Sequence, residues 1–404
     1  MSGAWRWACL ALLPLAGCAS APDGAADRPP QARAAPGWDR AFTRDDGWTG
    51  ADGAYSLELP DGRVLWLFSD TWIGPVRQGK HAQGSTLVNN SLGLHPRSRD
   101  GAAPAPQALS FAWGAEDPAR PGTPGGAWIA PQLPGEAPRG WYWLSDAALV
   151  PGGPQGRRLV IFLQHIGPRP GGEGVWAFQS LGSALAVIDD WSGPPAGWRA
   201  RQVRIPQAVG AEQATPDRPE TSWGAAVLLR EEAGQELAYV YGVREDPGHK
   251  RLLVARAPAG ELGDPGAWRF FDGSSWVDDA ARAAPVADEL VNELSVDEVA
   301  VEGRPCLVMV HSQPAFGDQV LGRTARRPEG PWSPAAPLLR VEEVRRHASY
   351  FTYAGKAHAE LSRPGELLVT WVLNAHDFEA MVADAEIYRP RFARVPLSLF
   401  PAPP

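Results

Sequence analysis

A pattern of paired strands recurs five times along this chain. Each copy consists of a polar residue, a strand-like run, a Gly or Pro turn and a strongly apolar strand. The copies lie at residues 52–72, 145–167, 222–246, 293–314 and 358–375. Each interval leaves room for further strands, such as 197–206 and 267–277. Five antiparallel sheets in sequence predict an all-β, five-bladed β-propeller in a single domain, because radial closure hides most sheet edges. A two-sheet sandwich with long loops is the alternative.

The N-terminus has the features of an export signal. Trp5-Arg6-Trp7 precedes a short apolar run that ends in Leu15-Ala16-Gly17-Cys18, a sequence typical of a lipobox. We therefore expect residues 1–17 to be a lipoprotein signal peptide and Cys18 to carry the lipid. An ordinary cleaved signal peptide with an incidental cysteine is the alternative. Ala19 stands where an aspartate would retain a lipoprotein at the inner membrane, which favours the outer membrane or the cell surface.

The composition agrees with an exported body behind this anchor. Residues 18–37, rich in Ala, Pro, Asp and Arg, predict the lipidated cysteine and a flexible tether, and 38–404 the propeller. With Cys9 removed and Cys18 lipidated, only Cys306 remains, so a disulfide framework is impossible. The formal net charge of −8, with both signs interspersed, argues against nucleic acid. We expect a monomer that contacts the membrane only through its lipid.

The start of the first strand and the end of the second lie at the same end of a hairpin, so each repeat presents two rim positions. In the first repeat the Asp61-Gly62 turn places Asp52 opposite Asp70 or one diagonal step away. Two carboxylates so close cannot both ionise freely. The same rim positions in the other repeats are Asp146 and His165, Ser222 and Arg244, Glu293 and His311, and His358 and Asn374. In a propeller these ends converge on one central funnel.

Such a set suits hydrolysis of a glycosidic bond, which needs one carboxylic acid and one carboxylate. We expect Asp52, Asp70 and Glu293 to be catalytic. Trp72 and Trp223, beside rim polar residues, are candidates to stack on sugar rings. The structural alternatives are that strand ends are polar because they meet solvent and that tryptophans fill space between blades. The scattered histidines predict no dedicated zinc site. No cofactor is expected, although a central calcium ion stays open.

Four segments carry a resemblance to a known family. They are "GADGAYSLELPDGRVLWLFSDTWIG" (50–74), "LVNNSLGL" (87–94), "NELSV" (292–296) and the motifs within 353–395. These segments resemble the family called domain of unknown function 4185, over nearly all of the mature chain. That family is similar to five-bladed propeller glycosidases, and some members are assigned as endo-acting D-arabinofuranan hydrolases. The resemblance implies a glycoside hydrolase with Asp52 and Asp70 in the funnel, Glu293 as acidic partner, and Asn89 and Asn90 as hydrogen-bonding groups for substrate.

The sequence therefore predicts an exported lipoprotein glycoside hydrolase that cleaves furanose-containing, arabinan-type glycan, with a polysaccharide or oligosaccharide as its partner. The remaining residues expected to bind substrate are Asp146, His165, Arg244, His311 and His358. One alternative is a surface propeller that binds glycan without turnover. Another is a structural envelope lipoprotein with a plugged funnel.

Overall fold

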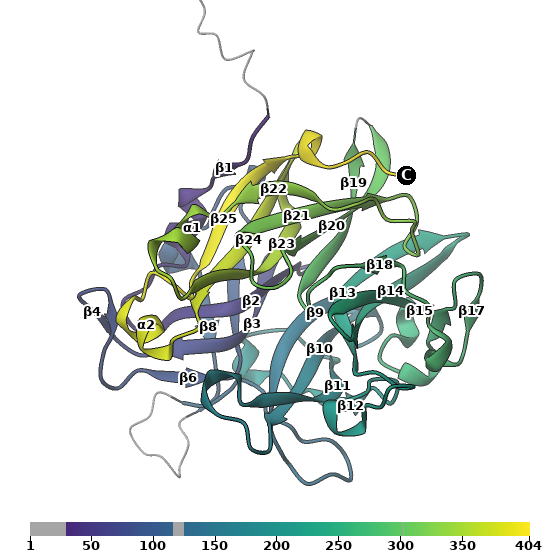
Figure 1. Cartoon of the computed structure of the whole chain (residues 1–404), viewed down its shortest axis with the longest axis horizontal. Coiled ribbons are helices and arrows are strands. Elements are labelled where there is room, and N and C mark those ends of the chain that lie inside the picture. Colours follow the sequence, from purple (N-terminus) through teal and green to yellow (C-terminus); the bar gives the residue numbers. More distant parts are fainter. Residues whose placement is uncertain (1–29, 116–124, 302) are drawn as a thin grey trace, which may run out of the picture. The chain divides into compact units, whose positions relative to one another are not determined.

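The computed structural model describes residues 30–115, 125–301 and 303–404. The predicted signal peptide, Cys18 and most of the predicted tether lie outside these residues. Residues 31–404 form one all-β unit. Its strands form five large sheets that follow one another around a common centre, and one small two-stranded sheet (Figure 1). In the described segments, no helix is long and apolar enough to cross a membrane.

Each of the five large sheets is one blade of a propeller. Its strands run outward from the centre in chain order, except that β1 is the outermost strand of blade 5. Blade 1 contains β2 (Trp48–Glu58), β3 (Arg63–Ile73), β7 (Ser91–Pro96) and β8 (Ser110–Ala112), with β6 (Thr86–Val88) beside β3. Blade 2 contains β9 (Trp141–Pro151), β10 (Arg157–Pro168), β11 (Phe178–Ile188) and β12 (Arg201–Arg204). Blade 3 contains β13 (Thr221–Glu232), β14 (Gln235–Asp246), β15 (His249–Pro258), β16 (Arg269–Phe271) and β17 (Trp276–Val277), with β18 (Ala287–Asp288) beside β15.

The last two blades complete the ring. Blade 4 contains β19 (Leu294–Val301), β20 (Arg304–Ser312), β21 (Gln319–Ala325) and β22 (Ala336–Arg340). Blade 5 contains β23 (Tyr350–Arg363), β24 (Glu366–Ala375), β25 (Pro390–Pro396) and β1 (Arg33–Ala34). The innermost strands β2, β9, β13, β19 and β23 each contact the next around the ring, and β23 contacts β2. The five-bladed propeller predicted from the repeats is therefore confirmed.

Strand β1 closes the ring, because it comes from the N-terminal end of the unit and pairs with the last strand. Arg33 and Ala34 lie opposite Arg394 and Ala393. Helix α1 (Pro36–Ala41) follows at once. The expected boundary between residues 37 and 38 falls inside this helix, and β1 already belongs to the fifth sheet. Strands from both ends of residues 31–404 therefore belong to blade 5.

Apolar residues fill the space between neighbouring blades in five clusters, one for each interface. Trp66 lies between blades 5 and 1, and Trp371 between blades 4 and 5. Flat aromatic side chains suit this position because two twisted sheets leave a thin, wide gap. These two tryptophans therefore serve packing between blades, as the structural alternative for tryptophans supposed.

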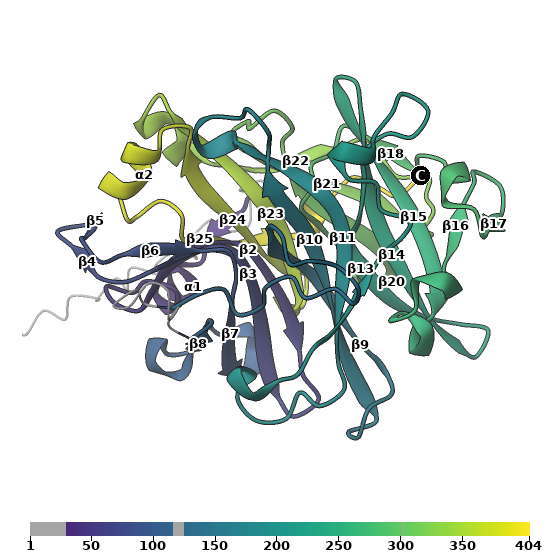
Figure 2. The same cartoon turned by 90° about the horizontal axis from the view of Figure 1, so that it is seen from below.

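Blades 1 and 5 carry additional elements at the end where β3 and β24 finish. Strands β4 (Val76–Arg77) and β5 (Lys80–His81) form a small hairpin after β3, and helix α2 (Phe378–Ala383) follows β24. Figures 1 and 2 show the hairpin and α2 side by side, and the Ala385 amide donates to the Gly79 carbonyl. This end of the propeller is the one that carries the rim residues.

Inner strands bulge just inside this rim. In β2 the register passes from Ala51 opposite Thr71 to Gly53 opposite Phe68, and similar shifts occur near Gly224 in β13 and Gly355 in β23. Gly53 has φ +79°, a conformation that favours glycine. A bulge bends its strand and re-aims the side chains around it. These bulges decide which side chains of the inner strands face the funnel.

Candidate active site

Asp52 and Asp70 come together at the bulge of blade 1. Asp52 lies between the pairs Ala51–Thr71 and Gly53–Phe68, so its partners across the ladder are Ser69 and Asp70. The charge of Asp70 raises the pKa of Asp52. The hairpin register thus agrees with the geometry expected from the Asp61-Gly62 turn.

Two phenols hold one oxygen of Asp52 and leave the other free. Tyr353 on β23 and Tyr388 after α2 both donate to Oδ2, at 2.7 and 2.8 Å. Oδ1 is buried and has no hydrogen-bond partner among the described residues. Burial, Asp70 and Glu293 together raise the pKa of Asp52 well above its usual range, and the two phenols oppose this effect. Oδ1 is therefore the oxygen whose capacity to accept a hydrogen bond is left unused by the described residues.

Asp70 is held as a hydrogen-bond acceptor. The Trp143 indole N–H donates to Oδ1 at 2.8 Å, and the Asn89 amide donates to the same atom at 3.2 Å. Burial raises the pKa of Asp70 to about 6 despite these two donors. Both donors stabilise the ionised form, so Asp70 acts on Asp52 through its charge.

Glu293 approaches the pair from blade 4, directly before β19. Its charge raises the pKa of Asp52, which places it within electrostatic range of that carboxyl group. Burial raises the pKa of Glu293 itself, while the ammonium of Lys356 opposes the rise. Nζ of Lys356 lies 3.8 Å from Oε2 of Glu293, which makes an ion pair too long for a hydrogen bond. Within the described parts of the chain, Oε2 has no hydrogen-bond donor.

Lys356 is a buried cation between these carboxyl groups. Its side chain is 1% exposed, and Nζ donates to the carbonyl of Ala354 at 3.1 Å and lies 4.3 Å from the centre of the Tyr55 ring. Burial lowers its pKa, whereas Glu293, Asp52 and Asp146 raise it. One buried cation faces three carboxyl groups, and their mutual repulsion favours keeping a proton on one of them. The rim therefore offers both a proton donor and a proton acceptor.

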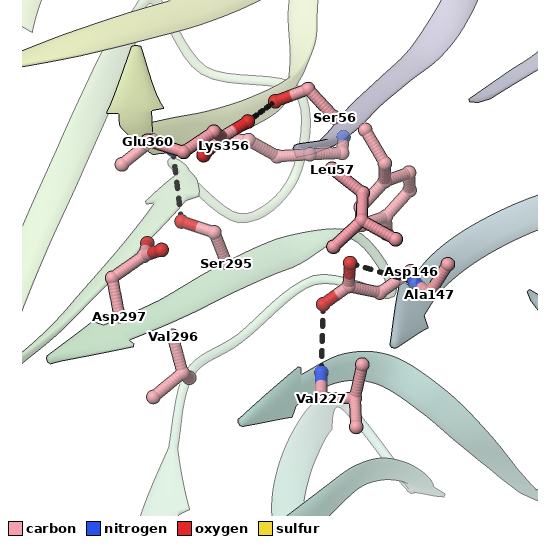
Figure 3. Close-up of a pocket in the computed structure, with 12 residues that line it drawn as sticks. Ser56, Leu57, Asp146, Ala147, Val227, Ser295, Val296, Asp297, Lys356 and Glu360 are labelled. Carbon is pink, nitrogen blue, oxygen red and sulfur yellow. Dashed lines mark hydrogen bonds between the residues drawn. The ribbon is translucent and has the colours of Figure 1, made fainter. Parts of the chain in front are cut away.

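A second group of acidic residues lies deeper along the propeller axis. There a cavity of about 140 Å³ is lined by residues of all five inner strands (Figure 3). Asp146 points into it and accepts from the amides of Ala147 and Val227 at 2.8 and 2.7 Å. Burial raises the pKa of Asp146 to about 7. The structure thus places Asp146 below the rim with its oxygens occupied by backbone, away from the position expected for a substrate ligand.

The lower cavity also contains Asp297, Glu360 and the Lys356 stem. Burial raises the pKa of Glu360 to about 7, and that of Asp297 well above its usual range. Across residues 30–115, 125–301 and 303–404, no group of three or more His, Cys, Asp or Glu side chains has a geometry that could hold a metal ion. We assign no metal ligands.

Two tryptophans expected to bind sugar belong to the core instead. Trp223 has no exposed surface and packs on Trp268 and Phe270 between blades 2 and 3. Trp72 is 4% exposed and stacks on His81 at 4.2 Å. Neither ring has a free face for a ligand. The sequence position next to a polar rim residue was misleading because side chains alternate between the two faces of a strand.

The predicted rim histidines are also structural. His165 bonds the Arg139 carbonyl at 2.9 Å, and His311 bonds the Ser312 carbonyl at 2.8 Å and accepts from Arg323. His358 packs on the Trp66 ring and bonds Ser56. All three are at most 2% exposed. Burial lowers the pKa of His311 to about 4 and that of His358 to about 3, so both are neutral rings in the core.

Arg244 and Asn90 both have hydrogen-bond partners within the protein. Arg244 forms a two-pronged ion pair with Asp246, with both distances 3.1 Å. Asn90 is fully buried, donates to the carbonyls of Ile129 and Tyr142, and accepts from the Ile129 amide. It fastens the chain before blade 2 to blade 1. Asn89 alone of the predicted pair reaches the site, through Asp70.

The sequence did not identify four residues that interact with the rim carboxyl groups: Trp143, Tyr353, Lys356 and Tyr388. Tyr353 and Lys356 begin the segment 353–375, and their strand bulges between them. Because the bulge adds an unpaired step, alternation alone cannot tell which side chains face the funnel. Trp143 occupies an inner strand two residues after its start, where a search for an aromatic donor near Asp70 would have found it.

The chain is similar to several solved structures, the first of which shows the same fold. A hydrolase candidate from Bacteroides ovatus is 19% identical, with a TM-score of 0.67 over 92% of each chain. The α-L-arabinofuranosidase of Podospora anserina, solved with cellotriose, is 11% identical, with a TM-score of 0.43 over 87% of this chain and 91% of that one. A family GH43_1 enzyme of Xanthomonas citri, solved with xylotriose, is 14% identical, with a TM-score of 0.44 over 89% and 92%. No curated protein matches this sequence.

The propeller implied by the resemblance to domain of unknown function 4185 is present, but the family that matches is a different one. Its model spans residues 36–397, which include all five inner strands and the three rim carboxyl groups. The chain belongs to the family described as Domain of unknown function (DUF5005).

Proposed function

We propose that this protein is an exported lipoprotein glycoside hydrolase that cleaves furanose-containing, arabinan-type glycan at the rim of its propeller. The observation that carries the proposal is the meeting of Asp52, Asp70 and Glu293 from two blades in one electrostatically linked set. Export and the lipid rest on the lipobox at Cys18. The sugar class rests on the family resemblance of the sequence motifs.

In this mechanism Glu293 is the general acid. Its proton passes to the glycosidic oxygen as the bond from that oxygen to the anomeric carbon breaks. Asp52 uses its free Oδ1, and Asp70 tunes the pKa of Asp52 through its charge. In a single displacement, Asp52 takes a proton from the water that attacks the anomeric carbon. In a double displacement, Asp52 attacks that carbon, and water releases the sugar in a second step. Either route adds one water molecule across the bond.

The test compares variants of the purified protein on a panel of plant and bacterial polysaccharides, with reducing ends as the readout. Asp52→Asn, Asp70→Asn and Glu293→Gln are each expected to lower activity at least ~100-fold, because each removes a charge or proton used in the transition state. Asp297→Asn is the matched control, since Asp297 is a buried acidic residue of the lower cavity, below the rim. Full activity in Asp52→Asn would refute the mechanism. Binding of glycan without hydrolysis in the wild type would identify a glycan-binding propeller instead.

A further inference from the structure

Two exposed aromatic side chains of this protein, Trp176 and Phe316, meet at the mouth of the funnel. In the part of the chain that the structure describes, four large hydrophobic residues are exposed: Val175, Trp176, Phe316 and Phe378. The first two lie in the loop between β10 and β11 of blade 2, and Phe316 lies in the loop between β20 and β21 of blade 4. An exposed pair of aromatic rings in contact, such as Trp176 and Phe316, marks a surface that binds a ligand.

Trp176 reaches across the funnel from blade 2 to the opposite blades. Its ring lies 5.5 Å from Phe316, 6.1 Å from Phe351 and 5.9 Å from His376, measured between ring centres. Phe351 and His376 belong to blade 5. Blade 1, with both aspartates, lies between blades 2 and 5 in the ring, so this contact bridges over the end of blade 1.

The bridge continues down to both aspartates through further aromatic rings. On one side, Trp176 contacts Phe178, which contacts Trp143, the residue that donates to Asp70. On the other side, Phe351 contacts Tyr353, which donates to Asp52. We call Trp143, Phe178, Trp176, Phe351 and Tyr353 the aromatic arch. Its two ends donate hydrogen bonds to Asp70 and to Asp52.

We propose that the aromatic arch holds the single sugar unit at a chain end or branch, so that the enzyme removes terminal units and does not cut within chains. This inference rests on the proposed function. Cleavage within a chain needs a groove open at both ends, whereas the ring contacts of Trp176 with Phe351 and His376 cross from blade 2 to blade 5. Aromatic planes suit the C–H faces of a neutral sugar ring, and the acidic rim disfavours an anionic one. Trp176 is 41% exposed, so part of its surface is accessible to a sugar ring.

The test separates binding from turnover. Arabinotriose affinity is measured by calorimetry in the Asp52→Asn variant alone and combined with Trp176→Ala or Val175→Ala. Trp176→Ala is expected to weaken binding roughly fivefold to tenfold, because it removes one stacking surface. Val175→Ala, a change in the same exposed loop without an aromatic ring, is expected to leave affinity unchanged. Equal affinity in the Trp176→Ala and Val175→Ala variants would overturn the arch as a binding surface.

Product size tests the mode of action independently. Wild-type enzyme is expected to release only single sugar units at early times from linear arabinan, and to be inactive on the same polymer with blocked non-reducing ends. Early release of longer fragments, or activity on the blocked polymer, would overturn the proposal while leaving the hydrolase function intact. If no glycan is hydrolysed, the proposed function fails. Binding that depends on Trp176 would then still support the arch as a sugar site.

Discussion

At the scale of single residues, the site is defined by which carboxylate oxygens are occupied. Asp52 has one oxygen held by two phenols, and Asp70 has one oxygen held by an indole and an amide. Hydrogen bonds to a carboxylate favour its ionised form, whereas burial favours the neutral form. The balance between these effects sets the pH at which Asp52 can act as a base or nucleophile. Removing a hydrogen-bond donor to Asp52 should therefore shift the pH profile of the hydrolytic activity.

Tyr353→Phe should move the acidic limb of the pH profile upward. The change deletes one donor to Asp52 and keeps the ring, so the pKa of Asp52 rises further and more base is needed to ionise it. A hydrogen bond to a charged group of this kind corresponds to a shift of about one pH unit. The measurement is kcat/KM against pH. Tyr142→Phe serves as the control, because Tyr142 bonds Gln202 and does not contact the rim carboxylates. An unshifted limb in Tyr353→Phe would show that Asp52 is not the titrating group.

At the scale of elements, hairpin pairing was readable from the sequence and bulges were not. All five predicted hairpins exist, because apolar alternation and Gly turns act locally. The alternation fails where Gly53, Gly224 and Gly355 add unpaired steps to the inner strands. The Asp52–Asp70 pair was predictable because it depends on a single local turn, Asp61-Gly62. The partners Tyr353 and Lys356, and the buried state of His358, depend on contacts between blades that no local pattern contains.

The bulge of blade 1 gives a prediction about a single glycine. Gly53→Ala should destabilise the fold and reduce activity, because φ is +79° and a Cβ would lie 3.0 Å from the Ser69 amide nitrogen. Gly62→Ala is the matched control: φ is +81°, and no atom lies within 4 Å of its Cβ. Left-handed backbone costs about 1 kcal/mol in both variants, and the close contact should roughly double the loss for Gly53→Ala. The measurements are the free energy of unfolding by chemical denaturation and the hydrolytic activity of each variant. Equal losses in the two variants would mean that the bulge relaxes.

At the scale of the whole molecule, five blades meet around buried acidic side chains. The lower cavity is lined by Ser56 of blade 1, Asp146 of blade 2, Val227 of blade 3, Asp297 of blade 4 and Glu360 of blade 5. Burial raises the pKa of Asp146 and of Glu360 to about 7. The folded protein therefore binds these protons more tightly than the unfolded chain does. Ionisation of these two carboxyl groups therefore destabilises the folded propeller.

This linkage predicts how stability changes with pH. Because the folded pKa of Glu360 is raised, the folded state loses stability as pH rises from about 4.5, its usual value, to about 7. Glu360→Gln keeps the acceptor for the Ser56 hydroxyl and cannot ionise. It should match the wild type near pH 4.5 and exceed it by about 1–3 kcal/mol at pH 8. The measurement is the free energy of unfolding by urea at several pH values.

The difference between variant and wild type is the informative quantity, because other groups also titrate. The buried neutral rings of His81, His311 and His358 have lowered pKa values, so below their usual pKa of 6.5 they destabilise the fold as pH falls. These effects are the same in both proteins and cancel in the difference. Glu379→Gln on the exposed surface of α2 should show no pH-dependent gain. If Glu360→Gln is stabilised as much at pH 4.5 as at pH 8, the gain in stability comes from packing. In that case the carboxyl groups of the lower cavity do not govern the stability of the propeller.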